Sequence, residues 1–213
     1  MHLYWHGLTS VRIESSLGDV SCTLLTDPYG SDTGLRFPRT LEPNVLVLSH
    51  QNRELFAVDA LKSTPFTIAD PGEYEVQGVF VFGTTLQEEG QKHPLPLMYR
   101  FEIEGMSIGF IGAITKAPSE EQLARLENID ILLIPVGGGA YLDAKKATEI
   151  VQVLEPRIVV PLAYETEGMT VPLASVDLFC KEVGGKRLDA NKLKLARKDL
   201  PAEELVVQVL ERS

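Results

Sequence analysis

The sequence predicts an α/β protein built as a four-layer helix-sheet-sheet-helix (αβ/βα) sandwich. Apolar runs of strand length are frequent up to about Gly112, and strand and helix patterns alternate after this residue. No low-complexity linker separates the two parts. Two sheets that are each covered by helices on one face bury their other faces against each other. We therefore expect one domain over residues 1–213, made of two halves at about 1–112 and 113–213.

The first half is expected to be dense in strands. Short runs of β-branched, aromatic and other apolar residues, bounded by turn residues, predict them. The expected strands span residues 3–5, 10–14, 20–25, 45–48, 66–68, 79–82, 98–103 and 106–111. Helical periodicity in this half is confined to residues 54–62.

The second half alternates between helices and strands. We expect helices over residues 119–126, 143–154 and 176–183, and strands over residues 131–135, 157–161, 193–196 and 205–210. Ser119 with Gln122 three residues later is a capping-box pattern, and Asp143 can cap the next helix. Both helix starts therefore have a physical cause in the sequence.

Composition limits the classes of function. The chain has a formal net charge of -10, which disfavours binding to the phosphates of nucleic acid. It has no apolar run long enough to span a membrane and no signal-peptide pattern at its start, so we expect a cytoplasmic protein without a membrane partner. Cys22 and Cys180 lack a C-x-x-C spacing, and we expect two reduced thiols rather than a disulfide.

A polar cluster is expected where the strand over residues 45–48 ends. The strand runs into Ser49 and His50, and a turn and a helical segment follow. Asp27, His50, Asn52 and Glu54 are expected to approach one another at this rim. Asp27 and Glu54 could hold His50 in its charged form, or the residues could satisfy one another and cap the following helix. We favour the second interpretation, because polar groups at strand ends need partners in any case.

Several segments resemble one known family. They are LYWHGLTSVRIE near the N-terminus, Asp27-Pro28-Tyr29, DPGEYEVQGVFVFG from Asp70 to Gly83, and the stretch from Ile131 to Leu162. They resemble the metallo-β-lactamase superfamily, in particular the small bacterial metal-dependent hydrolases related to L-ascorbate-6-phosphate lactonase. The resemblance extends from residue 1 to about residue 210, and it implies that superfamily's metallo-β-lactamase-like four-layer αβ/βα sandwich.

The resemblance also implies a metal site, but the metal-binding motif differs here. The family's H-x-H-x-D-H motif aligns with His50-x-Asn52-x-Glu54-Leu55, so only its first histidine matches. The other histidines in the sequence are His2, His6 and His93, and none of them has a recognised ligand spacing. We expect His2 and His6 to lie on a strand surface and His93 to lie in a solvated loop.

The remaining ligand positions of the family are also replaced. The bridging aspartate aligns with Ala113, the late histidine aligns with Ala163, and Leu8 stands where a histidine is usual. A catalytic zinc needs about three His, Cys, Asp or Glu ligands around an open position, so we expect no metal cofactor. The expected vestigial pocket consists of Leu8, Asp27, His50, Asn52, Glu54, Leu55, Ala113 and Ala163.

Two classes of function remain. In the first, the protein is non-catalytic, and it binds or scaffolds an unknown small molecule or protein, with a homo-oligomer left open. In the second, it is a metal-dependent hydrolase of a small lactone or phosphoester that uses a reduced or unusual site holding zinc or manganese. The count of available ligands favours the first class.

Overall fold

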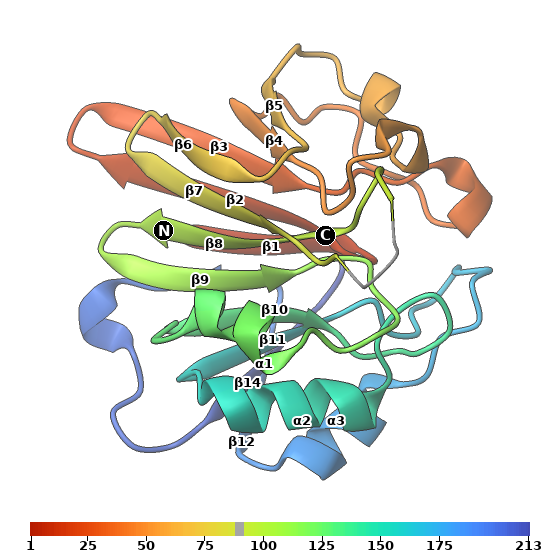
Figure 1. The fold of residues 1–213 in the computed structure, drawn as a ribbon, viewed down its shortest axis with the longest axis vertical. Coiled ribbons are helices and arrows are strands. Elements are labelled where there is room, and N and C mark those ends of the chain that lie inside the picture. Colours follow the sequence, from red (N-terminus) through yellow and green to blue (C-terminus); the bar gives the residue numbers. More distant parts are fainter. Residues whose placement is uncertain (88–91) are drawn as a thin grey trace.

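The computed structural model describes residues 1–87 and 92–213, and it confirms the two-sheet sandwich (Figure 1). The first sheet has the order β13-β1-β2-β3-β4-β5 and the second has the order β12-β14-β11-β10-β9-β8-β7-β6. The first sheet consists of β1 (His2–Gly7), β2 (Ser10–Leu17), β3 (Val20–Thr26), β4 (Val45–Val47), β5 (Phe66–Ile68) and β13 (Leu193–Lys194). The second consists of β6 (Gly72–Val76), β7 (Val79–Thr85), β8 (Leu97–Ile103), β9 (Met106–Ile111), β10 (Ile131–Pro135), β11 (Ile158–Leu162), β12 (Lys186–Ala190) and β14 (Val206–Leu210).

Within the described residues, the α-helices all belong to the second half of the chain. They are α1 (Glu120–Leu123), α2 (Ala144–Leu154) and α3 (Val176–Val183), and they lie beside the β10, β11 and β14 strands (Figure 1). The predicted caps are confirmed: Ser119 and Gln122 form the capping box of α1, and the Asp143 side chain accepts from the Lys146 N–H. Within the described part of the chain, no helix is long and apolar enough to cross a membrane.

Parallel pairing fixes where polar residues can gather. In the first sheet β3, β4 and β5 are parallel, and in the second β9, β10, β11, β14 and β12 are parallel. Every residue of β9, β10 and β11 is buried, as expected for parallel strands that are covered on both faces. Loops at the carboxyl ends of these strands are therefore the natural place for a site.

The residues of β4 and the residue after it, Leu48, alternate between two hydrophobic cores. Val45 and Val47 face the main core between the sheets, whereas Leu46 and Leu48 face a second core on the outer side of the first sheet. Residues of the long loops after β3 and β4, including Phe37 and Leu61, complete this second core. The outer layer of the first sheet is thus made by loops and short 3-10 helices.

The predicted helix over residues 54–62 is wrong. This segment contains two 3-10 helices, Arg53–Leu55 and Val58–Ala60, separated by Phe56 in an extended conformation. The Ala57 N–H donates to the Pro28 carbonyl at 2.9 Å, so tertiary contact replaces a bond within a helix. The helix predicted over residues 119–126 likewise ends early, because α1 continues as a 3-10 helix.

The sheets divide the chain at a different place from the predicted halves. The chain leaves the first sheet after β5 and enters the second at β6, and β13 later returns to the first sheet. The expected division into halves near residue 112 therefore does not coincide with the division between the sheets. Cys22 is buried and Cys180 is half-buried, and both are free thiols.

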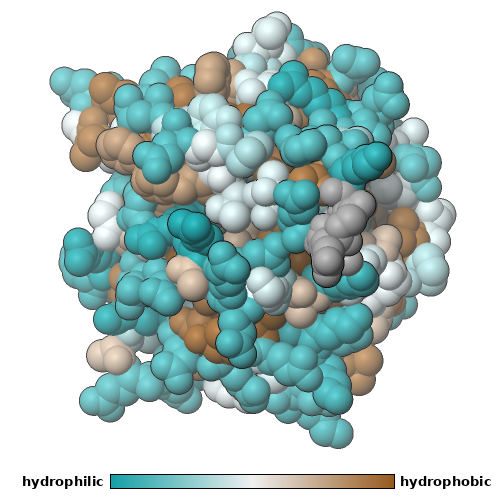
Figure 2. Space-filling view, viewed as in Figure 1, coloured by the Kyte–Doolittle hydropathy of each residue, from teal (hydrophilic) through white to brown (hydrophobic). Residues whose placement is uncertain are grey.

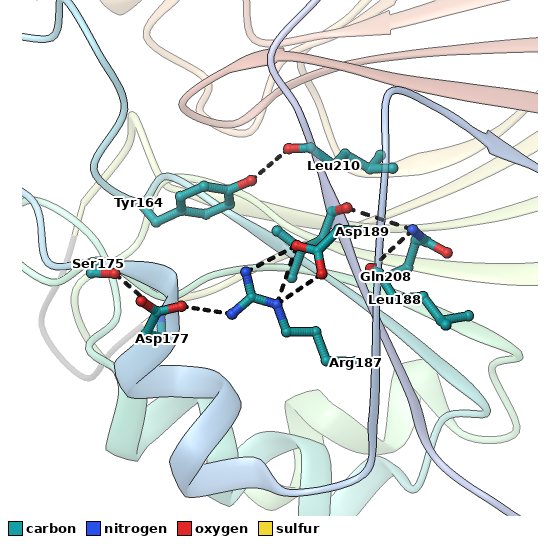
Figure 3. Close-up of polar contacts among 9 residues, drawn as sticks. Tyr164, Ser175, Asp177, Arg187, Leu188, Asp189, Gln208 and Leu210 are labelled. Carbon is teal, nitrogen blue, oxygen red and sulfur yellow. Dashed lines mark hydrogen bonds and ion pairs between the residues drawn. The ribbon is translucent and has the colours of Figure 1, made fainter.

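Strand β12 was not predicted, because KRLDA has no apolar alternation typical of a strand. It pairs with β14 at the edge of the second sheet, and its charged residues connect it to α3 (Figure 3). The Arg187 guanidinium contacts Asp177 at 2.6 Å and Asp189 at 2.9 Å. Charges at this edge also disfavour pairing with another chain.

One group of exposed apolar residues lies at the end of the molecule where two hairpins turn. Brown residues lie where the β2–β3 and β6–β7 hairpins turn (Figure 2), and Leu17, Val20 and Phe80 are exposed. The rest of the face shown in Figure 2 is mainly hydrophilic, in keeping with the acidic composition.

Candidate functional site

The candidate site is a cleft where loops from both sheets meet. It is a cavity of about 260 Å³ that includes residues following β1, β3, β4, β9 and β10. Its lining includes Leu8, Asp27, His50, Leu55, Ala113 and Tyr141. Residues from distant parts of the sequence converge here because strands of both sheets end at this rim.

The predicted pocket residues are only partly brought together. Leu8, Asp27, His50, Leu55 and Ala113 line the cleft. Among the other predicted residues, Asn52 is half-buried, Glu54 is exposed, and neither lines this cleft. Ala163 is fully buried, and its N–H donates to the Leu8 carbonyl at 3.0 Å, so it supports the lining from behind.

Asp27 is the buried centre of a hydrogen-bond network. Its carboxylate accepts from the Ser49 N–H at 2.8 Å and from the Ser49 hydroxyl at 2.6 Å. The Ser49 Oγ in turn accepts from the Ala113 N–H at 3.1 Å. Burial raises the pKa of Asp27 to about 6, while hydrogen bonds from Ser49 and Thr9 oppose the rise. The network ties together the residues that follow β3, β4 and β9.

The close contact between Ser49 and the end of β9 depends on Gly112. A Cβ atom at this position would overlap the Ser49 side chain. Glycine is therefore required here by the approach of two chain segments rather than by a turn.

His50 is neutral and is oriented by the main chain. Its Nδ1 accepts from the Asn52 N–H at 2.9 Å, so the ring proton of the neutral form is on Nε2. Burial lowers the pKa of His50. The idea that Asp27 and Glu54 hold His50 in its charged form is therefore wrong, because Asp27 is engaged with Ser49 and Glu54 is exposed.

The alternative interpretation of this rim is confirmed for Asn52. Its side chain accepts from the Glu54 N–H and caps the 3-10 helix Arg53–Leu55. Ser49 and His50 are adjacent in sequence but bond in different directions, Ser49 to Asp27 and His50 to the Asn52 N–H. A hydroxyl nucleophile activated by the neighbouring imidazole is thus not formed.

Three residues at or directly behind the cleft lining have a strained backbone conformation. Leu8, Asp27 and Ala163 have positive φ angles of 47°, 38° and 48°. Side-chain-bearing residues rarely adopt this left-handed region, and each such residue costs of order 1–3 kcal/mol. Well-packed surroundings must hold these conformations, and such strain is common at binding and catalytic sites.

The sequence did not predict Tyr141 as a site residue. It lies in the glycine-rich loop after β10, and burial and the nearby Asp27 carboxylate raise the pKa of its phenol to about 12. Its position at the carboxyl end of a parallel strand was the available signal.

The residues at this site do not fit a catalytic metal. A metal-binding histidine needs a free ring lone pair and donates its other N–H to an acceptor, whereas Nδ1 of His50 is itself the acceptor. Both carboxylate oxygens of Asp27 already accept from Ser49, and Leu8, Leu55 and Ala113 offer no side-chain ligand. Among the described residues, no group of three or more His, Cys, Asp or Glu is placed to hold a metal ion.

The remaining histidines lie away from the cleft lining. His2 lies 3.8 Å from Glu14 on the strand surface, as expected. His6 is buried, contrary to expectation, and its Nδ1 lies 3.0 Å from the Ser213 carbonyl oxygen. Burial lowers the pKa of His6. His93 is exposed, and its Nδ1 lies 2.8 Å from the Gln51 Oε1.

Two stacked sheets with a cleft at the ends of parallel strands define the class of metallo-β-lactamase-fold proteins. The chain belongs to the beta-lactamase superfamily, because residues 2–163 match the beta-lactamase superfamily domain. A solved structure of a candidate Zn-dependent hydrolase of the metallo-β-lactamase superfamily from Thermotoga maritima has a TM-score of 0.77 and 26% identity, and covers 99% of both chains. The YhfI protein of Bacillus subtilis shares the fold, with a TM-score of 0.61, 9% identity and coverage of 99% of this chain and 97% of its own.

Curated relatives are named metal-dependent hydrolases. One from Pyrobaculum islandicum is 25% identical over 195 residues, or 78% of this chain and 85% of the relative. One from Nanoarchaeum equitans is 32% identical over 87 residues, or 40% of each chain. Two further relatives, from Pyrococcus abyssi and Pyrococcus furiosus, match over only 37% and 44% of their own lengths. The names of the Pyrobaculum islandicum and Nanoarchaeum equitans relatives imply a metal cofactor in the family.

Proposed function

We propose that this protein binds a small molecule in the cleft and does so without a catalytic metal. The observation that carries the proposal is the bonding of His50 and Asp27, two of the three lining residues that could serve as ligands; the third, Asp32, is a single exposed carboxylate. The free ring nitrogen of His50, Nε2, carries a proton and offers no lone pair to a metal. Both carboxylate oxygens of Asp27 accept hydrogen bonds from Ser49. The cleft remains open even though the chemistry of its lining differs from that of a metal site.

The lining indicates what kind of molecule would fit. His50 supplies a neutral N–H donor, and Tyr141 supplies a phenol that is protonated at neutral pH and whose pKa is raised further, to about 12. Leu8, Leu55 and Phe56 add apolar surface. Two donors above an apolar wall favour a ligand with hydrogen-bond acceptors and a hydrophobic part, as in many small-molecule sites.

In this proposal Asp27 has a structural role. A carboxylate at a metal site would turn its oxygens toward the ion, but here they hold Ser49, which in turn holds the Ala113 N–H. Asp27 therefore fixes the distance between the loops of the two sheets, and so the width of the cleft.

The second candidate is a metal-dependent hydrolase of a small lactone or phosphoester that uses zinc or manganese. The names of the relatives favour it. It would require His50 to lose its bond from the Asn52 N–H and Asp27 to release Ser49 before either could bind an ion.

Metal content decides between the two candidates. We expect protein purified without chelator to contain well under one equivalent of zinc, manganese or iron by elemental mass spectrometry. Two equivalents that are lost in His50→Ala would overturn the proposal and support the hydrolase.

A constructive variant tests the same reasoning. Leu55 and Ala113 line the cleft beside His50, so Leu55→His together with Ala113→Asp adds two ligands where the cleft can hold an ion. We expect this double variant to bind zinc measurably. Ala163→His should instead destabilise the fold, because Ala163 is fully buried at a positive φ of 48°.

A further inference from the structure

A second cavity adjoins the cleft and is rich in arginine. It has a volume of about 1070 Å³, its lining includes Arg36, Arg39 and Arg212, and no aspartate or glutamate lines it. Tyr29 and Gly30 line both this cavity and the cleft, so the two are neighbours. Within residues 1–87 and 92–213, no ion pair involves these three arginines.

This grouping of charge is unusual for the chain. The sequence has 30 Asp and Glu against 20 Lys and Arg, so carboxylates are the more abundant neighbours. Elsewhere in the structure arginines do form ion pairs with carboxylates, as Arg187 does with Asp177 and Asp189. Like charges that share a cavity repel one another, and a bound anion removes that repulsion.

The position of Arg212 is fixed by its surroundings. The Ser213 N–H donates to the Trp5 carbonyl at 2.9 Å, which pairs this segment with β1. The Arg212 guanidinium donates to the Arg36 carbonyl at 3.5 Å, and it lies near enough to Tyr29 to oppose the rise in the pKa of that phenol caused by burial. Arg212 thus links the end of the chain to the loop that carries the other two arginines.

The wall shared with the cleft is rigid. The Tyr29 ring packs edge-to-face on Phe37 with centroids 5.1 Å apart, and the Tyr29 hydroxyl donates to the His6 carbonyl. A rigid aromatic wall beside guanidinium groups needs little reordering when a ligand binds.

We propose that this cavity binds the oxyanion group, phosphate or carboxylate, of a small molecule whose remaining part reaches the cleft past Tyr29 and Gly30. Guanidinium groups match the geometry of both oxyanions with paired hydrogen bonds. That the remaining part of the ligand lies in the cleft rests on the proposed function. The binding of the anion does not, because none of the three arginines lines the cleft.

Isothermal titration calorimetry at low ionic strength tests the anion site. The probes are inorganic pyrophosphate and citrate, each titrated into the whole protein. We expect at least one of them to bind, and the preferred probe identifies the oxyanion as phosphate or carboxylate. Arg36→Gln with Arg39→Gln, and separately Arg212→Gln, should each weaken binding by roughly tenfold or more, because each removes charge-assisted hydrogen bonds.

Arg125→Gln is the matched control for Arg212→Gln, since Arg125 lines a different cavity and each of these two variants removes one positive charge. The Arg125→Gln variant should bind the preferred probe within about twofold of the wild type at equal ionic strength. An equal loss in Arg125→Gln, or no binding of either probe at millimolar concentration, would overturn the inference. The metal content of the protein is measured separately, so the failure of one proposal does not conceal the failure of the other.

Discussion

Asp27→Asn tests how the buried carboxylate of the cleft affects stability. Burial raises the pKa of Asp27 from 3.8 to about 6, so the folded protein holds this proton more tightly than the unfolded chain does. The resulting stability is fully present below about pH 4 and is lost as the pH rises through about 6. The difference between the two pKa values, at about 1.4 kcal/mol per pH unit, corresponds to about 3 kcal/mol.

Urea unfolding between pH 4 and pH 7.5 measures this effect. The unfolding free energy of the wild type minus that of Asp27→Asn should fall by about 2–3 kcal/mol as the pH rises. Asp32→Asn is the control, because Asp32 is an exposed carboxylate that lines the same cleft, and its profile should run parallel to the wild type. The argument that burial affects the pKa of Asp27 more than its hydrogen bonds do would be refuted by a different result. That result is a difference in unfolding free energy between the wild type and Asp27→Asn that stays constant or grows as the pH rises.

Three further predictions concern the same network and the metal. Ser49→Ala should destabilise the protein by about 2–4 kcal/mol in urea unfolding, because it removes the hydroxyl that binds both Asp27 Oδ2 and the Ala113 N–H, and only the Ser49 N–H bond to Asp27 Oδ1 remains. Ser107→Ala should be nearly neutral, since its buried hydroxyl has no partner. Gly112→Ala should cost about 1–3 kcal/mol through overlap with Ser49, and an unchanged urea midpoint would contradict the close approach. A chelator should leave the melting temperature unchanged in calorimetry, and a drop of several degrees that one added metal reverses would favour the hydrolase.

Much of the fold could be predicted because buried strands have a strong local signal. The apolar runs that became β9, β10 and β11 are buried throughout, and their spacing by helices indicates parallel pairing. The helix α3 was predicted with its observed bounds, since its periodicity and its polar N-cap agree. Strands β6 and β12 were missed because they lie at the edge of a sheet, where side chains can stay polar.

The site was predicted less completely because its members meet only in three dimensions. The resemblance supplied Leu8, Asp27, His50, Leu55 and Ala113, which do line the cleft. It could not supply the direction in which each side chain bonds. That His50 accepts at Nδ1 follows from the turn after β4, and this turn forms because Asn52 caps a 3-10 helix.

The sequence by itself determined the two-sheet sandwich, the acidic character and the scarcity of ligand residues at the expected metal positions, because these depend on residue type and order alone. The tertiary structure decided that Asp27 holds Ser49, that Tyr141 enters the cleft, and that the arginines of the neighbouring cavity gather around Tyr29. These features join segments far apart in the chain. Only the packing of one loop against another fixes such contacts, and no local pattern in the sequence carries that information.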